Sequence, residues 1–451
     1  MHPPDPPCQP KDVHNAQRTR SALNLGVLLV LATTTISAQT APDESQQKRI
    51  NSFETVWTTV RDKHWDVRPG GLDWQAIHAE YRPLVVRAKN DNEALEITRQ
   101  MLARLKQTHF AIFAPGIADE IANDEGDGTP GFETRILNGH VIVTDVFANS
   151  QVRPGWEILA AGNWDMATLL DKLRADSAIT PYAQERALES RQTGPVGTTK
   201  HFTFVNGAGE HVALDIQLQN QRGNLAGFGN LPPQHIWFEF SKRANTGLIR
   251  FNEFLDLPRL MPAFGQAIHD CASCDGLIID LRGNPGGIGG MAMGMAGFLT
   301  DREEQKLGTM YMRGATLKFV LNPRAEAFTG PLAILVDGTS ASTSEIFAGG
   351  LQDLHRARIF GTHTAGAALP SVITRLPNGD AFQYAVANYI SEGGQALEGQ
   401  GVTPDVEVRL TRESLLAGHD AVLDAAAAWI QTQKIQPQKI QPQKIQPRSQ
   451  P

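Results

Sequence analysis

The chain has 451 residues, with 41 lysines and arginines against 48 aspartates and glutamates. This length is enough for two or three domains with substantial hydrophobic cores. The net charge of -7, together with the lack of a basic cluster, argues against a nucleic-acid partner and favours neutral or modestly charged ones.

The first apolar segment covers residues 21–38. It follows Arg18 and Arg20 and ends with the small residues Ser37 and Ala38, as the region before a signal-peptidase site does. We therefore predict a signal peptide at residues 1–38 and export to the periplasm or the extracellular space. An uncleaved N-terminal segment that anchors the protein to a membrane is the alternative.

A helical region is predicted over residues 42–114. Its first helix places Phe53, Val56, Trp57 and Val60 on one face, at the spacing of a helix with one buried side. A second helix is expected after residues 90–92, whose side chains suit an N-cap, and a short strand at residues 110–113.

Short β patterns separated by turns fill residues 131–220. Residues 140–146 and 157–161 read as strands, and residues 201–205 and 211–218 as a hairpin that turns at Asn206 and Gly207. The pattern predicts a small β domain inserted into the chain.

Residues 234–432 alternate apolar strands with amphipathic helices, which predicts an α/β core around a largely buried sheet. A last, alanine-rich helix is expected at residues 420–430. The sequence Gln-Lys-Ile-Gln-Pro then occurs three times in the tail. We predict that residues 433–451 are disordered, because regularly spaced prolines prevent a continuous helix and little apolar surface is left to pack.

Three cysteines occur in the chain. Cys8 lies within the predicted signal peptide. Cys271 and Cys274 have the spacing of half a zinc site, but no second pair of ligands accompanies them. A local disulfide or two free thiols is the favoured interpretation for an exported protein, and neither a metal nor a cofactor site is predicted.

The most informative motif runs from Gly338 to Glu345 (GTSASTSE) and lies between an apolar strand pattern and a helical one. A serine at such a turn, Ser342, lies beside backbone N–H groups that no helical carbonyl satisfies, and these donors suit a developing oxyanion. The alternative is a purely structural capping box formed by Ser342 and Glu345.

A second motif, DLRGNPGG at residues 280–287, ends the strand predicted at residues 276–281. Its glycines permit close approach of the backbone to a ligand. One N–H group of Gly286 or Gly287 and that of Thr343 are therefore the predicted donors of an oxyanion hole.

In these motifs the chain resembles the tail-specific, or C-terminal processing, serine proteases and their tricorn-core relatives. The resemblance extends to ARLKQTHFAIF (103–113), RARIFGTHTAG (356–366) and LEGQGVTPDVEV (397–408). It implies a crotonase-like α/β protease core at residues 234–432, an N-terminal helical region, and a PDZ-like domain at residues 131–220.

The resemblance also implies which residues act. Ala367 occupies the position of the lysine that activates the serine in the processing-peptidase branch, and an alanine cannot accept a proton. In the tricorn-like branch, a histidine preceded by a serine and a late glutamate replace that lysine. Thr108, His109 and Glu398 match those positions, with threonine in place of serine.

Three further residues lie in or near the matched motifs. His363 is a rival base, because it precedes the missing lysine by four residues. Asp353 matches a family position near the site, although a structural carboxylate at a helix terminus explains it equally well. Arg282, in the glycine motif, is interpreted as structural.

The resulting hypothesis is an exported serine endopeptidase that cuts unstructured peptide or protein substrates. The resemblance to PDZ-containing proteases implies that it recognises them through their free C-termini. The alternative is a non-catalytic protein on the same fold that binds peptides or apolar ligands, which the missing lysine makes credible.

Overall fold

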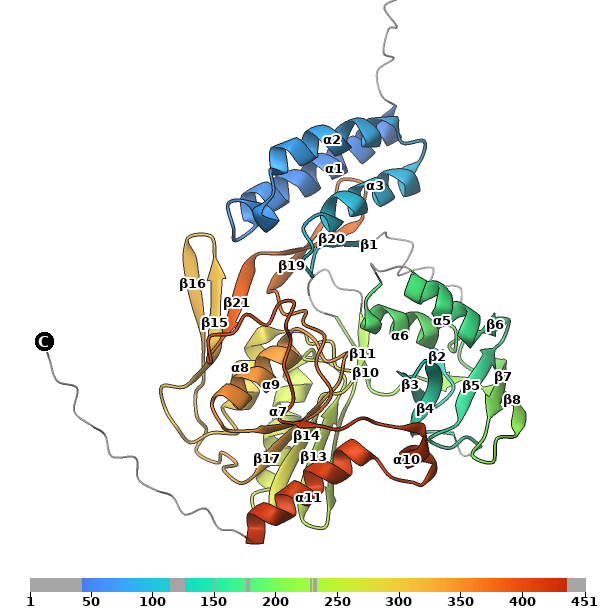
Figure 1. Cartoon of the computed structure of the whole chain (residues 1–451), viewed down its shortest axis with the longest axis vertical. Helices are drawn as coiled ribbons and strands as arrows, with labels where there is room; N and C mark the ends of the chain where they lie inside the picture. The colour runs from blue at the N-terminus through green and yellow to red at the C-terminus, as the bar shows by residue number, and fades with distance from the viewer. Residues whose placement is uncertain are drawn as a thin grey trace, which may run out of the picture. The chain divides into compact units, whose positions relative to one another are not determined.

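The computed structural model describes residues 43–113, 126–149, 151–175, 179–227, 229 and 233–435 (Figure 1). The predicted signal peptide lies outside these residues, as does the tail after residue 435. Among the helices of the described part, none has the length and apolar character needed to cross a membrane.

The N-terminal region contains three helices, each starting after an aspartate or asparagine whose side chain accepts a backbone N–H of the first turn. They are α1 (Glu44–Lys63), α2 (Trp74–Arg87) and α3 (Asp91–Ala103), with a 3₁₀ turn η1 (Pro69–Gly71). The sequence predicted α1 and α3. It did not single out α2, because Pro83 lies inside that helix and obscures its pattern.

The chain then enters a three-stranded antiparallel sheet in the order β1 (Ala111–Phe113), β20 (Ala381–Ala385) and β19 (Ser371–Arg375). Residues of β20 and the loop before it, Phe382 and Leu376, complete the hydrophobic cluster of the three helices. The three helices are thereby fixed against a segment more than 250 residues later in the chain.

Residues 126–220 form a β-rich insert with its own hydrophobic cluster. Its main sheet has the order β3-β4-β5-β7-β8, in which β3 is an edge strand, and β6 pairs with β5. The bounds are β3 (Phe132–Leu137), β4 (His140–Val146), β5 (Glu157–Ala161), β6 (Trp164–Asp165), β7 (Thr199–Val205) and β8 (His211–Gln217), with helices α5 (Met166–Ala175) and α6 (Pro181–Ser190).

The core is a six-stranded sheet in the order β12-β13-β14-β17-β18-β22. All neighbours after β12 pair in parallel. The strands are β12 (Phe238–Arg243), β13 (Thr246–Phe251), β14 (Gly276–Asp280), β17 (Leu332–Val336), β18 (Arg358–Gly361) and β22 (Val406–Glu407). The prediction of a mixed α/β core with a buried sheet is confirmed.

Both faces of this sheet are covered by helices. On β14, Leu277 and Ile279 belong to one hydrophobic cluster and Ile278 to another, as expected for a strand buried on both sides. One face packs against α7 (Leu257–Asp270), α8 (Gly289–Ala296) and α9 (Thr343–Asp353), and the other against α11 (Ala421–Ile435) (Figure 1).

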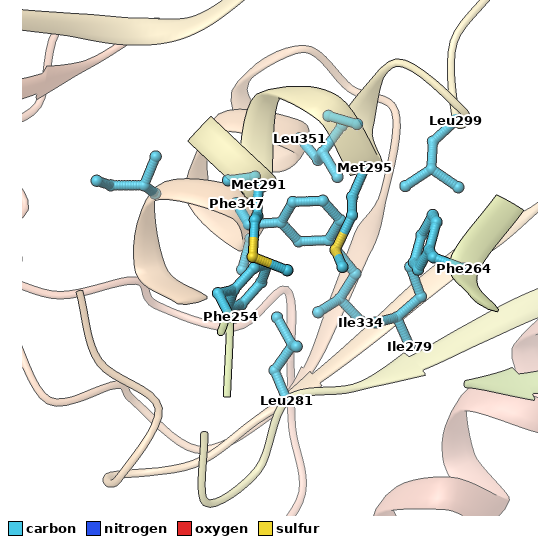
Figure 2. Close-up of a cluster of buried hydrophobic side chains, with 14 of the residues drawn as sticks. Phe254, Phe264, Ile279, Leu281, Met291, Met295, Leu299, Ile334, Phe347 and Leu351 are labelled. Carbon is cyan, nitrogen blue, oxygen red and sulfur yellow. The ribbon is translucent and has the colours of Figure 1, made fainter. Parts of the chain in front are cut away.

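Figure 2 shows the first of these clusters, where Phe347 of α9 lies among Met291, Met295 and Ile334. Burial of each such side chain contributes roughly 1.5–3 kcal/mol. Gly350 allows α9 to pack closely, since a Cβ there would lie 2.6 Å from that of Leu307. The helix that follows Ser342 is thus held rigidly on the sheet.

The sequence did not indicate several strands that surround this core. A second three-stranded sheet has the order β16 (Ala315–Val320), β15 (Lys306–Met312) and β21 (Ala387–Ser391). Two short pairs join β2 (Gly128–Thr129) to β9 (Gln219–Asn220) and β10 (Asn224–Ala226) to β11 (Gln234–Ile236). A short helix, α10 (Arg412–Leu416), precedes α11.

Two details bear on the predictions. The disordered tail was predicted to begin at residue 433, but helix α11 continues to Ile435. The first proline of the repeats is Pro437, and a proline disfavours helical backbone only from the residue before it onwards. The helix can therefore extend to Ile435. Cys271 and Cys274 form a disulfide, which is one of the two states that the sequence left open.

Candidate active site

Ser342 lies at the turn between β17 and α9 with φ 54° and ψ -116°. A non-glycine residue seldom adopts this conformation, which costs roughly 1–3 kcal/mol and occurs where the surroundings enforce it. Its backbone N–H donates to the carbonyl of Ala367 at 2.8 Å and to Oε2 of Glu345 at 3.0 Å. The strained turn is therefore held by two acceptors outside it.

Glu345 has no exposed surface, and its carboxylate holds residues 364–367 against the serine turn. Besides the N–H of Ser342, its carboxylate accepts the hydroxyl of Thr364 at 2.5 Å and the N–H groups of Gly366 and Ala367 at 2.7 and 2.9 Å. Burial raises the pKa of Glu345, and these four donors oppose that rise. The capping interaction with Ser342 is present, but it is one part of a larger network.

The glycine turn abuts the serine turn. A Cβ on Gly286 would lie 2.9 Å from the Cβ of Ser342 and 2.7 Å from the backbone nitrogen of Thr343. A Cβ on Gly287 would lie 2.4 Å from the carbonyl oxygen of Phe254. The φ angles of 103° and 134° also favour glycine at these two positions. No larger residue fits without moving the backbone.

The structure distinguishes the predicted oxyanion donors. The N–H of Gly286 donates to Oδ1 of Asn284 at 2.9 Å, so it is already used within the turn. Within the described residues, the N–H groups of Gly287 and Thr343 have no acceptor, while the Thr343 hydroxyl donates to the Gly287 carbonyl at 2.8 Å and joins the two turns. Of the alternatives Gly286 and Gly287, the geometry favours Gly287.

Two side chains that the sequence did not single out hold these turns in place. Asn284, fully buried, donates to the carbonyl of Phe251 and accepts from Gly286 and from the hydroxyl of Ser344. Asp337 accepts from the N–H groups of Gly283, Thr339 and Ser340 at 3.0–3.1 Å. The sequence could have indicated both residues by their position, since Asn284 lies within the glycine motif and Asp337 directly precedes the serine motif.

Thr108 and His109 meet Glu398 in a continuous hydrogen-bonded chain. Glu398 accepts the N–H of Thr108 at 2.7 Å through Oε1 and its hydroxyl at 2.8 Å through Oε2. The oxygen of that hydroxyl lies 2.7 Å from Nδ1 of His109. Since the hydroxyl hydrogen points at the carboxylate, Nδ1–H donates to Thr108, and Nε2 is left unprotonated.

Burial lowers the pKa of His109 to about 4, so the imidazole is neutral at pH 7. Burial also raises the pKa of Glu398, against the opposing effect of hydrogen bonds from Thr108 and from the N–H of Ala368. A neutral imidazole with a fixed tautomer has the properties that a general base requires.

The dipeptide Ala367-Ala368 connects this chain of groups to the serine turn. The carbonyl of Ala367 accepts from Ser342, and the N–H of Ala368 donates to Oε2 of Glu398 at 3.1 Å. Residues 367–368 thus lie between the serine turn and the hydrogen-bonded chain of Glu398, Thr108 and His109.

The other sequence-predicted residues lie outside this relay. His363 is exposed, and its Nδ1 lies 2.9 Å from the carbonyl of Thr364. Asp353 accepts the N–H of Gly393 at 2.7 Å, which is a structural contact. Arg282 forms ion pairs with Asp280 and Asp420 at 2.6 and 2.7 Å and links β14 to the start of α11.

A cavity of about 860 Å³ adjoins the edge strand β3 and helix α6 of the insert and reaches the core at Asp337. Arg135 on its wall lies between Glu185 of α6, at 3.6 Å, and Asp337, at 3.9 Å. Neither Ser342 nor His109 lines this cavity, so it is separate from the candidate catalytic groups.

Comparison with known proteins agrees with this geometry. Residues 245–408 match the family described as peptidase family S41, and residues 45–103 match the tricorn protease C1 domain. The predicted resemblance to C-terminal processing and tricorn-like proteases is therefore confirmed.

Individual relatives match parts of the chain. A carboxy-terminal-processing protease of Bartonella bacilliformis is 34% identical over 33% of this chain and 34% of its own length. Carboxyl-terminal-processing peptidase 3, chloroplastic, of Arabidopsis thaliana is 29% identical over 49% of this chain and 43% of its own. The chain thus matches less than half the length of these curated relatives.

Among solved structures, the photosystem II D1 C-terminal processing protease superposes with a TM-score of 0.52. The superposition covers 83% of this chain and 98% of that one, at 19% sequence identity. At this identity the likeness concerns the fold alone.

Proposed function

We propose that the chain, whose residues 245–408 match peptidase family S41, is a serine endopeptidase with Ser342 as nucleophile. The Ser342 hydroxyl attacks a peptide carbonyl carbon, and Nε2 of His109 accepts its proton. The imidazolium then protonates the leaving amine, and water hydrolyses the acyl-enzyme in the same way. The N–H groups of Gly287 and Thr343 stabilise the oxyanion.

One observation carries this proposal: the hydrogen-bonded chain from Glu398 through Thr108 to His109. A serine has too high a pKa to attack unaided, so it needs a base with a fixed tautomer. Thr108 and Glu398 supply that orientation, and they stabilise the positive charge that the imidazole gains. Because Ala367 cannot act as a base, His109 takes the role of the absent lysine.

The proposal includes the finer organisation that the resemblance implies. The core is crotonase-like, and the insert at residues 131–220 is PDZ-like. Its edge strand β3 and the neighbouring helix α6 line a cavity large enough for the end of a peptide. The protein is exported, through the signal segment at residues 1–38.

Substrates are unstructured chains that are recognised near their free C-termini. A peptide strand added at β3 would place its terminal carboxylate near the cavity, whose wall includes Arg174 and Arg243. Amidation of a substrate's C-terminus should therefore raise KM. An unchanged KM would remove the insert from substrate recognition.

Active-site labelling with a fluorophosphonate tests the catalytic assignment. We expect the wild-type protein to be labelled and Ser342→Ala not to react at all. His109→Ala should react at least about 10²-fold more slowly, because general-base catalysis typically contributes 10²–10⁴-fold.

His363→Ala is the matched control for the histidine, because the His363 ring is exposed and its Nδ1 lies 2.9 Å from the carbonyl of Thr364. This variant should be labelled at the wild-type rate. Labelling of Ser342→Ala equal to wild type would refute the proposal. The non-catalytic binding alternative predicts no labelling of any variant.

A further inference from the structure

The proposed catalytic base lies in a loop without regular secondary structure. Residues 104–110 join α3 to β1, and within them Lys106 and His109 have positive φ angles of 52° and 60°. Such a backbone is unfavourable for these residues and persists only where the surroundings enforce it. The core holds one side of the loop, since Glu398 binds both the N–H and the hydroxyl of Thr108. The other side contacts the N-terminal helices.

His64, at the C-terminal end of α1, makes these contacts. Its Nε2 lies 2.9 Å from Oε1 of Gln107, two residues before His109. Its ring also stacks with that of Phe110, the residue after His109, with 5.7 Å between the ring centroids and 16° between the planes. One ring thus contacts the loop both before and after the proposed base.

The hydrogen bonds of His64 determine its tautomer. The N–H of Asp66 donates to Nδ1 at 3.0 Å, so the ring proton is on Nε2 and is donated to the side chain of Gln107. Burial lowers the pKa of His64, so the imidazole is neutral at pH 7. Because a buried N–H group without an acceptor is costly, this bond restrains Gln107 in its position.

The ring of His64 is itself held rigidly. The residue has no exposed surface, and its backbone N–H donates to the carbonyl of Val60 at 3.1 Å, which closes the last turn of α1. The ring also stacks with that of Trp65, with 3.9 Å between the centroids. Helix α1 is packed in the hydrophobic cluster of the N-terminal region. A side chain locked in this way can fix the position of a neighbouring loop.

We propose that His64 is a positioning residue for catalysis. Its contacts with Gln107 and Phe110 hold the loop in the strained conformation that places the imidazole of His109 for proton transfer. The helical region thereby holds one side of the loop, and Glu398 of the core holds the other. This inference rests on the proposed peptidase function, since it concerns the base of that reaction, and His64 acts on the base through the loop.

Rate constants of fluorophosphonate labelling test the inference. His64→Phe retains an aromatic ring but has no N–H to donate, and Gln107→Met removes the acceptor of the same bond. The double variant His64→Phe/Gln107→Met removes both partners. His78→Phe is the matched control, because it makes the same exchange in α2, at a ring that packs on Trp57 and is bonded to Glu54 of α1.

We expect the rate constant to fall about tenfold or more in each single variant, because displacement of a catalytic group by about 1 Å can cost 10²-fold in rate. The double variant should be no slower than the slower single variant, since both changes break one bond. The control should have the wild-type rate constant. The final extent of labelling should be unchanged throughout, since misfolded molecules lower the extent and not the rate constant.

Three results would overturn the inference: a wild-type rate constant in either single variant, an equal loss in His78→Phe, or losses that multiply in the double variant. Gln107 is partly exposed, so Gln107→Met remains decisive if His64→Phe does not fold.

Hydrogen exchange separates this result from the peptidase assignment. The N–H of Thr108 donates to Glu398, and its exchange rate reports on the loop without any reaction. It should exchange about tenfold faster or more in His64→Phe and Gln107→Met than in wild type and His78→Phe. If the wild-type protein is not labelled, the peptidase function fails, while the exchange rates still decide whether His64 holds the loop. Equal exchange in all these proteins would refute that role.

Discussion

Glu398 holds Thr108 at two points, its backbone N–H at 2.7 Å and its hydroxyl at 2.8 Å, although the two residues are 290 positions apart. The double contact fixes both the position of the Thr108 backbone and the direction of its hydroxyl. His109 follows directly in the chain, with φ 60°, and its ring donates to that hydroxyl. The orientation of the imidazole is therefore set by a carboxylate that never touches it.

The first prediction concerns the threonine in this relay. Thr108→Val keeps the shape of the side chain but removes the hydroxyl, so that His109 loses its acceptor and the preferred tautomer. We expect kcat to fall by about 10²-fold or more, while Thr108→Ser retains most of the activity. The measurement is the rate of peptide cleavage. Equal rates for Thr108→Val and Thr108→Ser would show that the hydroxyl has no role.

The second prediction concerns the glycine turn. Gly287→Ala places a Cβ 2.4 Å from the carbonyl oxygen of Phe254 and must move the N–H that is predicted to bind the oxyanion. Loss of one such donor costs about 3 kcal/mol of transition-state stabilisation, or 10²–10³-fold in kcat.

Gly314→Ala is the matched control for this change. Gly314 also has a positive φ, 78°, but no atom lies within 4 Å of its added Cβ. The Gly314→Ala variant therefore measures the effect of backbone strain alone, and its rate of peptide cleavage should equal that of the wild-type protein. Comparable losses of kcat in the two variants would argue against an oxyanion role for the glycine turn.

The third prediction concerns Glu345. Glu345→Gln places an amide NH₂ group among four donors, so at least one buried hydrogen bond is replaced by repulsion. We expect the free energy of unfolding to fall by about 3 kcal/mol and the rate of phosphonate labelling of Ser342 to fall with it. Denaturant unfolding measures the first and labelling the second. Glu326→Gln, at an exposed glutamate, is the control, and indistinguishable behaviour of the two variants would contradict the network.

The fourth prediction is the pH dependence of cleavage. The pKa of His109 is about 4 in the folded protein against an ordinary value of 6.5, so the base remains neutral well below pH 6. The acidic limb of kcat/KM, measured with a substrate without cationic groups, should therefore fall near pH 4. A limb near pH 6.5 would mean that an ordinary, solvated histidine is the base.

The same shift has a consequence for stability. The unfolded chain protonates this histidine near pH 6.5 and the folded chain only near pH 4, so the unfolded state binds more protons in between. The contribution of His109 to stability is thus fully present above pH 6.5 and is lost progressively as the pH falls towards 4. In His109→Ala, the free energy of unfolding should vary less over this interval than in wild type.

Much of the fold followed from the sequence because it depends on local patterns. The apolar runs at residues 276–281 and 331–336 are buried on both faces, and such runs are readable without knowledge of their neighbours. The serine and glycine turns were likewise located by motifs within eight residues. Helix α2 and the strands β15, β16 and β19–β21 were missed, since an internal proline or a mixture of polar and apolar residues gave them no clear period.

By itself, the sequence determined that the core strands β13, β14 and β17 alternate with helices, where the turns that carry Ser342 and Gly287 lie, and a family resemblance that nominated Thr108, His109 and Glu398. Only the tertiary structure decided that Gly286 donates its N–H to Asn284 and that the carboxylate of Glu345 accepts from four donors. The physical reason is that hydrogen bonds between distant segments depend on the register of strands and the path of loops, which no local pattern of residues encodes.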